Sequence, residues 1–132
     1  MKIIGYIFLT LVILFVLVLV ISNVSNPSPG DAISFVEKGV RDLMKDPDSA
    51  TFDSVRFYPD TSPQGERISG VVCGYVNGKN SFNAYTGRVR FFSKITVYNN
   101  GRTANYSTPA IEEPTNSVSV GGMDNIWRES CK

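Results

Sequence analysis

Histidine is absent from this chain of 132 residues. Histidine is the commonest general base and the commonest metal ligand, so its absence excludes Ser-His-Asp and Cys-His catalytic arrangements. The only cysteines, Cys73 and Cys131, are too few for a structural zinc site. Neither G-x-x-x-x-G-K-[ST] nor G-x-G-x-x-G occurs. We therefore expect no metal, no cofactor and no catalytic residue, and the chain is predicted not to be an enzyme.

A strong excess of charge is also absent. The chain has 13 basic and 12 acidic residues, and without Lys2 the remainder is balanced at 12 of each. A neutral domain has no general electrostatic attraction to nucleic acid, so we expect no nucleic-acid partner.

The longest hydrophobic run covers residues 3–21 and reads IIGYIFLTLVILFVLVLVI. As a helix, 19 residues extend about 28 Å, close to the ~30 Å hydrocarbon core of a bilayer. A cleaved signal peptide has a shorter apolar stretch of ~7–15 residues and a small-residue cleavage site. No clean A-x-A pattern follows this run, and no cysteine suitable for lipid attachment lies near its end. We predict an uncleaved transmembrane anchor over residues 1–22.

Flanking charge predicts the orientation of the anchor. Lys2 and the terminal amine precede the run, and no charge follows it before Asp31. The positive-inside rule then places the N-terminus in the cytoplasm and the remainder outside. Two cysteines able to form a lasting disulfide agree with an oxidising compartment. The expected location is the inner membrane, with the domain in the periplasm.

A proline-containing linker is expected at residues 23–30, followed by one domain at 31–132. Asp31 is the predicted N-cap of an amphipathic helix that ends at Asp46-Pro47, with Glu37 and Arg41 paired on its exposed side. The apolar stripe of this helix is expected to pack on a sheet, with a partner-binding stripe as the alternative. Its members are Ile33, Val36, Val40, Leu43 and Met44.

Strands are predicted by alternation and by turn residues. The expected strands are 55–58, 68–77, 88–98 and 102–107, and Gly70 and Gly74 weaken the second strand or mark a bulge. Loops are expected at 59–66 and 77–87, and Asn100-Gly101 predicts a two-residue hairpin turn. An extended stretch at 108–122 then leads to a short helix capped by Asp124. Trp127 is expected to contact the core or to form a lid, with an exposed binding aromatic as the alternative. The predicted class is α+β, with an antiparallel sheet of three to four strands.

The two cysteines are predicted to form a disulfide. A bond between Cys73 and Cys131 closes a loop of about 58 residues. By lowering the conformational entropy of the unfolded chain, such a bond should stabilise the folded state by ~4 kcal/mol. The alternative is a reactive thiol, which usually occurs as C-x-x-C or beside a positioned base, and neither is present.

Charge is unevenly distributed along the domain. Six basic residues and no acidic residue lie between Glu66 and Glu112, whereas residues 31–66 hold eight acidic and four basic residues. One interpretation is solvated strand faces paired with the acidic helical region. The other is a basic face for phospholipid headgroups, an envelope polymer or an acidic protein. The candidate binding residues are Lys79, Asn80, Arg88, Arg90, Lys94 and Tyr98.

Two motifs are similar to those of a known group. DPDSATF at 46–52 and VCGYVNGKNSF at 72–82, followed by YTG at 85–87, resemble the K-D-P-[DE]-S-A-x-F and V-C-G-x-V-N-x-K-N-S-[FY]-G-G-Y patterns of small uncharacterised envelope proteins of Gram-negative bacteria and their phages. This chain has Asn83-Ala84 in place of Gly-Gly, and a spanning helix in place of the lipid-attachment cysteine. The resemblance implies a periplasmic domain and supplies no activity. Asn77, Lys79, Asn80 and Ser81 are expected to form a polar turn held by side-chain-to-backbone bonds, with a ligand-binding loop as the alternative.

These features together predict a membrane-anchored periplasmic binding protein that acts on another envelope component through residues 77–98. One alternative is a phage-encoded envelope protein for superinfection exclusion or lysis control. A pilin-like structural subunit is the other, although no glutamate lies early in the apolar run and Pro27 and Pro29 follow it.

Overall fold

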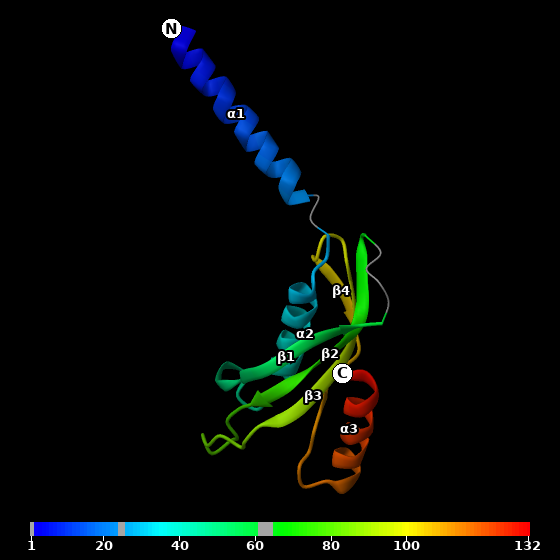
Figure 1. Ribbon diagram of the computed structural model, residues 1–132. Coiled ribbons are helices and arrows are strands. Elements are labelled where there is room, and N and C mark those ends of the chain that lie inside the picture. The colour runs from blue at the N-terminus through cyan, green and yellow to red at the C-terminus, as the bar shows by residue number, and fades with distance from the viewer. Residues whose placement is uncertain (1, 24–25, 61–64) are drawn as a thin grey trace.

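A computed structural model describes residues 2–23, 26–60 and 65–132 of the protein (Figure 1). The class is α+β, as predicted. The elements in chain order are α1 (Lys2–Asn23), α2 (Pro29–Leu43), the 3₁₀ turn η1 (Pro47–Ser49), β1 (Thr51–Pro59), β2 (Arg67–Asn77), β3 (Val89–Tyr98), β4 (Thr103–Tyr106), β5 (Ala110–Ile111) and α3 (Ser117–Ser130).

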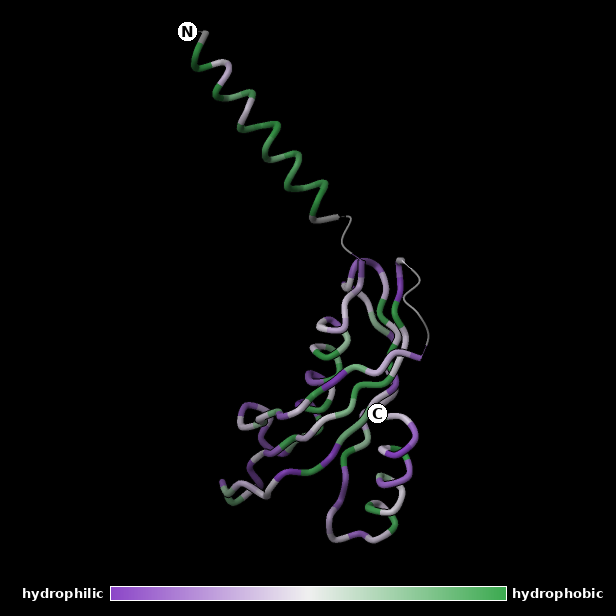
Figure 2. Tube along the Cα trace, viewed as in Figure 1, coloured by the Kyte–Doolittle hydropathy of each residue, from purple (hydrophilic) through white to green (hydrophobic). Residues whose placement is uncertain are grey.

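Helix α1 contains the hydrophobic run. Residues Ile3–Ile21 are long enough and apolar enough to cross a membrane (Figure 2), and all of their side chains are exposed. The predicted linker at 23–30 includes residues 24–25, which lie outside the described residues. Its last two residues, Pro29 and Gly30, belong to α2.

The start of α2 differs from the prediction by three residues. The N-cap is Ser28, not Asp31, and Pro29 occupies the first turn, where its missing N–H costs no hydrogen bond. Asp31 instead completes a capping box. The Ser28 N–H donates to Asp31 Oδ2 at 2.8 Å, and the Asp31 N–H donates to Ser28 Oγ at 3.3 Å.

The predicted apolar stripe of α2 packs against the sheet at Val36 and Val40, both of which are fully buried. Leu43 was wrongly included, since its side chain is 51% exposed, whereas Met44 packs against the core. The i,i+4 ion pair of α2 is Lys38–Asp42, rather than the predicted Glu37–Arg41. Arg41 donates to the carbonyls of Pro47 and Ala50, so it ties η1 to the end of the helix.

The sheet is antiparallel, with strand order β1-β2-β3-β4, and β5 pairs with β3. We call the side of the sheet that packs on α2 the inner face and the opposite side the outer face. The inner face and α2 form one apolar core. Its buried members are Ala32, Val36, Val40, Ala50, Ile68, Val72, Val76, Phe91, Ile95 and Val97. The alternation predicted for β3 is confirmed, because Phe91, Ile95 and Val97 are buried in this core.

The irregularity predicted near the β2 glycines lies in β1, opposite Gly74. The register between β1 and β2 shifts between Asp53 and Arg56. A Cβ on Gly74 would lie 2.8 Å from Val55 Cγ2 and 2.9 Å from the Phe91 ring. Gly74 therefore makes room for the bulged strand to approach β2.

The turn between β3 and β4 is longer than the predicted two residues. Tyr98 pairs with Thr103, so four residues connect the strands, and the Arg102 N–H donates to the Asn99 carbonyl at 3.1 Å. Asn99, Asn100 and Gly101 all have positive φ. Of the loop predicted at 59–66, residues 61–64 lie outside the described part.

The C-terminal segment is more ordered than predicted. The stretch expected to be extended over 108–122 contains β5, and α3 begins at Ser117. Its N-cap is Asn116, whose side chain accepts from the N–H groups of Val118 and Ser119. Asp124 lies inside the helix and is not its cap. The sequence prediction failed here because serine, glycine and asparagine are weak helix formers.

Candidate functional site

Helix α3 contacts the outer face of the sheet near Tyr75 and Arg90. The predicted disulfide between Cys73 of β2 and Cys131 is present, with the two Cα atoms 5.9 Å apart. Trp127 packs edge-on against Tyr75 at 5.0 Å between ring centroids, so it forms the expected core or lid contact. Met123 is buried. In Figure 1 the helix lies against the sheet on the side opposite α2.

The predicted basic residues Arg88 and Arg90 lie in this part of the molecule, and both are ion-paired. Arg88 pairs with Asp53 of β1 at 2.8 Å and stacks over the Tyr75 ring at 4.1 Å. Arg90 pairs with Glu112 and, at 2.7 Å, with Asp124 of α3. The hydrogen bond from Arg90 holds the pKa of Glu112 below its usual range, and the hydrogen bond to Glu112 raises the pKa of Arg90.

Lys94 and Tyr98 lie farther along β3, beyond α3's contacts with Cys73, Tyr75 and Arg90. Tyr98 lies eight positions after Arg90, which is about 27 Å along a strand. Lys79 and Asn80 lie in the β2–β3 hairpin, past the other end of β3. The six predicted binding residues therefore share one sheet and its hairpin, but they do not form one site.

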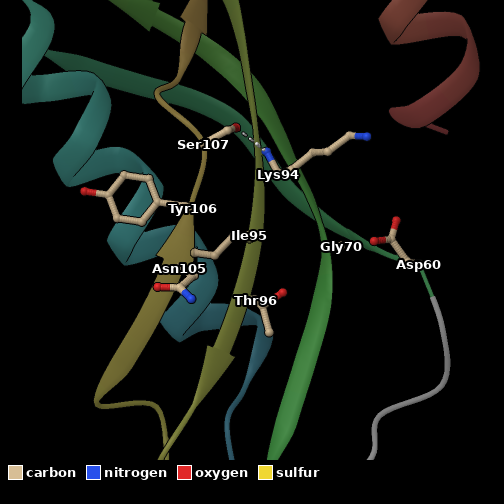
Figure 3. A pocket seen from close by; sticks show the side chains of 8 residues that line it. All are labelled: Asp60, Gly70, Lys94, Ile95, Thr96, Asn105, Tyr106 and Ser107. Atoms are coloured by element: carbon tan, nitrogen blue, oxygen red, sulfur yellow. Dashed lines mark hydrogen bonds between the residues drawn. The ribbon is translucent and has the colours of Figure 1, made fainter.

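A hollow of about 350 Å³ is lined by Lys94 and by residues from the end of β1 across to β4 (Figure 3). We call it the Lys94 hollow. It is lined by Asp60, Gly70, Lys94, Ile95, Thr96, Asn105, Tyr106 and Ser107. In Figure 3 Lys94 and Asp60 point away from the side of β3 on which Tyr106 lies against α2.

Hydrogen bonds fix the backbone and hydroxyl groups around the hollow. The Lys94 N–H donates to Ser107 Oγ at 3.2 Å, and the buried Ser93 hydroxyl donates to the Ser107 carbonyl at 2.7 Å. The hydroxyls of Thr96 and Ser69 are 3.0 Å apart. The Asp60 N–H donates to the Ser69 carbonyl at 3.0 Å, which extends the β1–β2 ladder and places the Asp60 carboxylate at the rim.

The Lys94 ammonium differs from the two arginines in its surroundings. Its side chain is exposed. Among the residues that the structure describes, no carboxylate lies within ion-pair distance of it. The hollow therefore offers one cation, one carboxylate, hydroxyls and an amide, a set suited to holding a polar or charged group. In the described part of the chain, no three His, Cys, Asp or Glu side chains are placed to hold a metal ion.

Asp60, Thr96, Asn105 and Ser107 were not among the predicted site residues. Thr96 lies two positions after Lys94 on the same strand, so the alternation of β3 could have predicted that both lie on the outer face. Asp60, Asn105 and Ser107 come from other strands and reach the hollow only through the register of the sheet.

Hydrogen bonds hold the hairpin at 77–87 together, as the polar-turn prediction requires. Asn80 Oδ1 accepts from the N–H groups of Phe82 and Ala84, and Asn77 Oδ1 accepts from the Gly87 N–H. Lys79 donates its backbone N–H to Ser49 Oγ at 2.8 Å.

No protein-family model, no curated protein and no solved structure shows significant similarity to this chain.

Proposed function

We propose that the chain is a membrane-anchored binding protein without catalytic activity, held by α1 in the inner membrane with its domain in the periplasm. In this proposal the Lys94 hollow binds the phosphate of anionic phospholipid headgroups. The observation that carries it is the contrast between Arg88 and Arg90, which are ion-paired, and Lys94, which is exposed and lines the same hollow as hydroxyl and amide groups.

The position of the hollow supports a ligand at the membrane surface. Lys94, Thr96 and Tyr98 belong to the half of β3 that leads to the turn at 99–102. That turn contacts the first turn of α2, because a Cβ on Gly101 would lie 2.6 Å from the Asp31 carboxylate. Five residues separate the end of α1 from the start of α2. The linker is therefore attached at the same end of the domain as the hollow.

The electrostatics favour a modest, salt-sensitive interaction. A basic side chain near an anionic membrane surface contributes about 1 kcal/mol and is screened within a Debye length. The ammonium supplies attraction, and the neighbouring hydroxyl and amide groups can donate to phosphate oxygens. Asp60 at the rim favours a headgroup that also carries a hydroxyl or amine donor.

Lysine footprinting of the full chain in vesicles tests the proposal. The rate of acetylation at each lysine is measured by mass spectrometry in phosphatidylglycerol vesicles and in phosphatidylcholine vesicles. We expect Lys94 to be protected by phosphatidylglycerol at low salt and to lose that protection at high salt.

Lys45 is the matched control, because it is exposed and follows the far end of α2. Its rate should be the same in both vesicles. Equal reactivity of Lys94 in the two lipids would overturn the proposal. Protection of Lys94 in both lipids would also count against it, because that result indicates simple burial at the bilayer.

A further inference from the structure

The β2–β3 hairpin at residues 77–88 presents an aromatic side chain to solvent. Phe82 is 91% exposed, more than any other large hydrophobic residue in the described part of the chain. Tyr85 in the same hairpin is 52% exposed. Aromatic residues that enter a partner's pocket dominate the energetics of many protein interfaces.

The hairpin holds Phe82 in a defined conformation. Asn80 organises the tip, because its backbone N–H donates to the Ala84 carbonyl at 2.9 Å and its side chain accepts from the Phe82 N–H at 2.9 Å. Thr86 donates both its N–H and its hydroxyl to the Gly78 carbonyl. A loop ordered before binding loses less conformational entropy on association, so the exposed ring is already prepared for a partner.

The base of the hairpin is fixed to the rest of the domain. Ser49 of η1 accepts from the Lys79 N–H and donates to the Asp46 carbonyl. A Cβ on Gly78 would lie 2.5 Å from Met44 Cε and 3.6 Å from the same Ser49 hydroxyl, so the loop packs closely on the segment between α2 and β1. The tip is thereby aimed by the body of the domain.

The tip lies at the end of the sheet away from the linker. The turn at 99–102, which contacts Asp31 at the start of α2, is separated from the hairpin by the ten residues of β3, or about 33 Å. This position favours an occupant other than the bilayer in which α1 is anchored. It also separates the tip from the Lys94 hollow.

Charge indicates the chemistry of the occupant. The Lys79 ammonium lies 5.6 Å from the Tyr85 ring centroid, and no acidic residue occurs between Glu66 and Glu112. Asp53 pairs with Arg88, whereas Lys79 has no ion pair with any residue that the structure describes, so Lys79 is the unpaired cation of the hairpin. A positively charged surface is complementary to an acidic one. The same charge disfavours a symmetric contact between two copies, since it would bring two Lys79 side chains together.

We propose that this hairpin is a docking site for a second protein with an apolar pocket and an acidic rim. Phe82 enters the pocket, Lys79 faces the acidic rim, and Asn80 acts as the positioning residue.

Site-specific photo-crosslinking of the full chain, in the cells that produce it, tests this proposal. A photoreactive phenylalanine analogue replaces Phe82, and in a control chain it replaces Val118, which is 81% exposed on α3. We expect one discrete heteroprotein adduct from position 82 and none from position 118. Tandem mass spectrometry should place the crosslink in an apolar segment flanked by Asp or Glu.

Second-site variants separate docking from chance proximity. Lys79→Glu and Asn80→Ala should each lower the adduct about fivefold or more, whereas Ser81→Ala in the same loop should leave it unchanged. Non-reducing electrophoresis checks that each variant keeps the Cys73–Cys131 bond, and Trp127 fluorescence checks that each variant is folded. An adduct of twice the chain's mass, a lipid adduct, equal adducts from 82 and 118, or a yield insensitive to Lys79→Glu would each overturn the proposal.

Discussion

The two faces of the sheet are held by different kinds of interaction. The inner face and α2 bury a continuous apolar core, in which Val36, Val72 and Phe91 have no exposed surface. On the outer face, Met123 is the only buried residue of α3, and the helix is held by the disulfide that follows it, one edge-on ring contact and the ion pair between Arg90 and Asp124. Hydrophobic burial suffices for the first face, whereas the second depends on covalent and charged contacts.

This difference indicates which surfaces of the domain are accessible to a binding partner. The inner face is occupied by its own helix. The outer face is covered at one end by α3 and carries the Lys94 hollow at the other, and the hairpin extends beyond the sheet with Phe82 exposed. The two proposed binding surfaces, the Lys94 hollow and the hairpin, therefore lie outside the apolar core between α2 and the sheet.

Truncating adjacent phenylalanines on opposite faces should give the largest contrast. Phe91 is fully buried and meets Phe52 edge-on at 5.7 Å, so Phe91→Ala should lower the free energy of unfolding by about 3–5 kcal/mol. Phe92 is half-buried on the outer face. Phe92→Ala should lower the free energy of unfolding by clearly less. Both values can be measured by urea unfolding of the full chain in detergent, with Trp127 fluorescence as the signal. Equal losses would mean that the outer face is as tightly packed as the inner one.

Removing the disulfide should loosen the outer face selectively. The double variant Cys73→Ser, Cys131→Ser should lose up to ~4 kcal/mol by loop-closure entropy. Because α3 is held largely by this bond, we expect hydrogen exchange to accelerate first in α3 and least in α2. Uniform acceleration across both helices would contradict the division into two differently held faces.

The ion pairs of Arg90 should show a smaller, pH-dependent effect. Glu112 is 12% exposed, so Glu112→Gln should cost about 1–3 kcal/mol at neutral pH. The pKa of Glu112 is lowered from its ordinary value of 4.5. Its contribution is therefore fully present above that value, and is lost as the pH falls through the lowered pKa of the folded protein. The difference in unfolding free energy between wild type and variant should shrink over that range.

Asp124 provides the internal control, because it pairs with the same arginine but is 55% exposed. Asp124→Asn should change the free energy of unfolding by less than about 1 kcal/mol. If Asp124→Asn lowered the free energy of unfolding as much as Glu112→Gln, the difference in burial would not explain how much each carboxylate contributes to stability.

Much of the fold was predictable because its signals are local. The strands Arg67–Asn77 and Val89–Tyr98 follow from alternation. The start of α2 was misplaced because Ser28 and Asp31 are both acceptable caps, and only the reciprocal bonds of the capping box distinguish them. Helix α3 was shortened because Ser117–Gly122 has low helix propensity, and contacts at Met123, Trp127 and Cys131 stabilise it.

The candidate sites were only partly predictable. Alternation placed Lys94, Arg90 and Tyr98 on one face, but alternation carries no information about which charges are neutralised. Arg90 meets Glu112 and Asp124, which lie 22 and 34 positions away in the chain. Phe82 lies in a run of polar turn residues, and its exposure depends on hydrogen bonds made by Asn80.

The sequence by itself determined three features of this protein. They are an apolar helix long enough to span a membrane, a sheet with one apolar face, and the only cysteine pairing that two cysteines allow. Each depends on composition or on hydrophobic residues that recur every two positions in a strand or about every 3.6 positions in a helix. Such patterns can be read from a short stretch of sequence. The tertiary structure alone decided that Arg88 and Arg90 are neutralised while Lys94 lines an open hollow, because strand register and the position of α3 bring distant residues together.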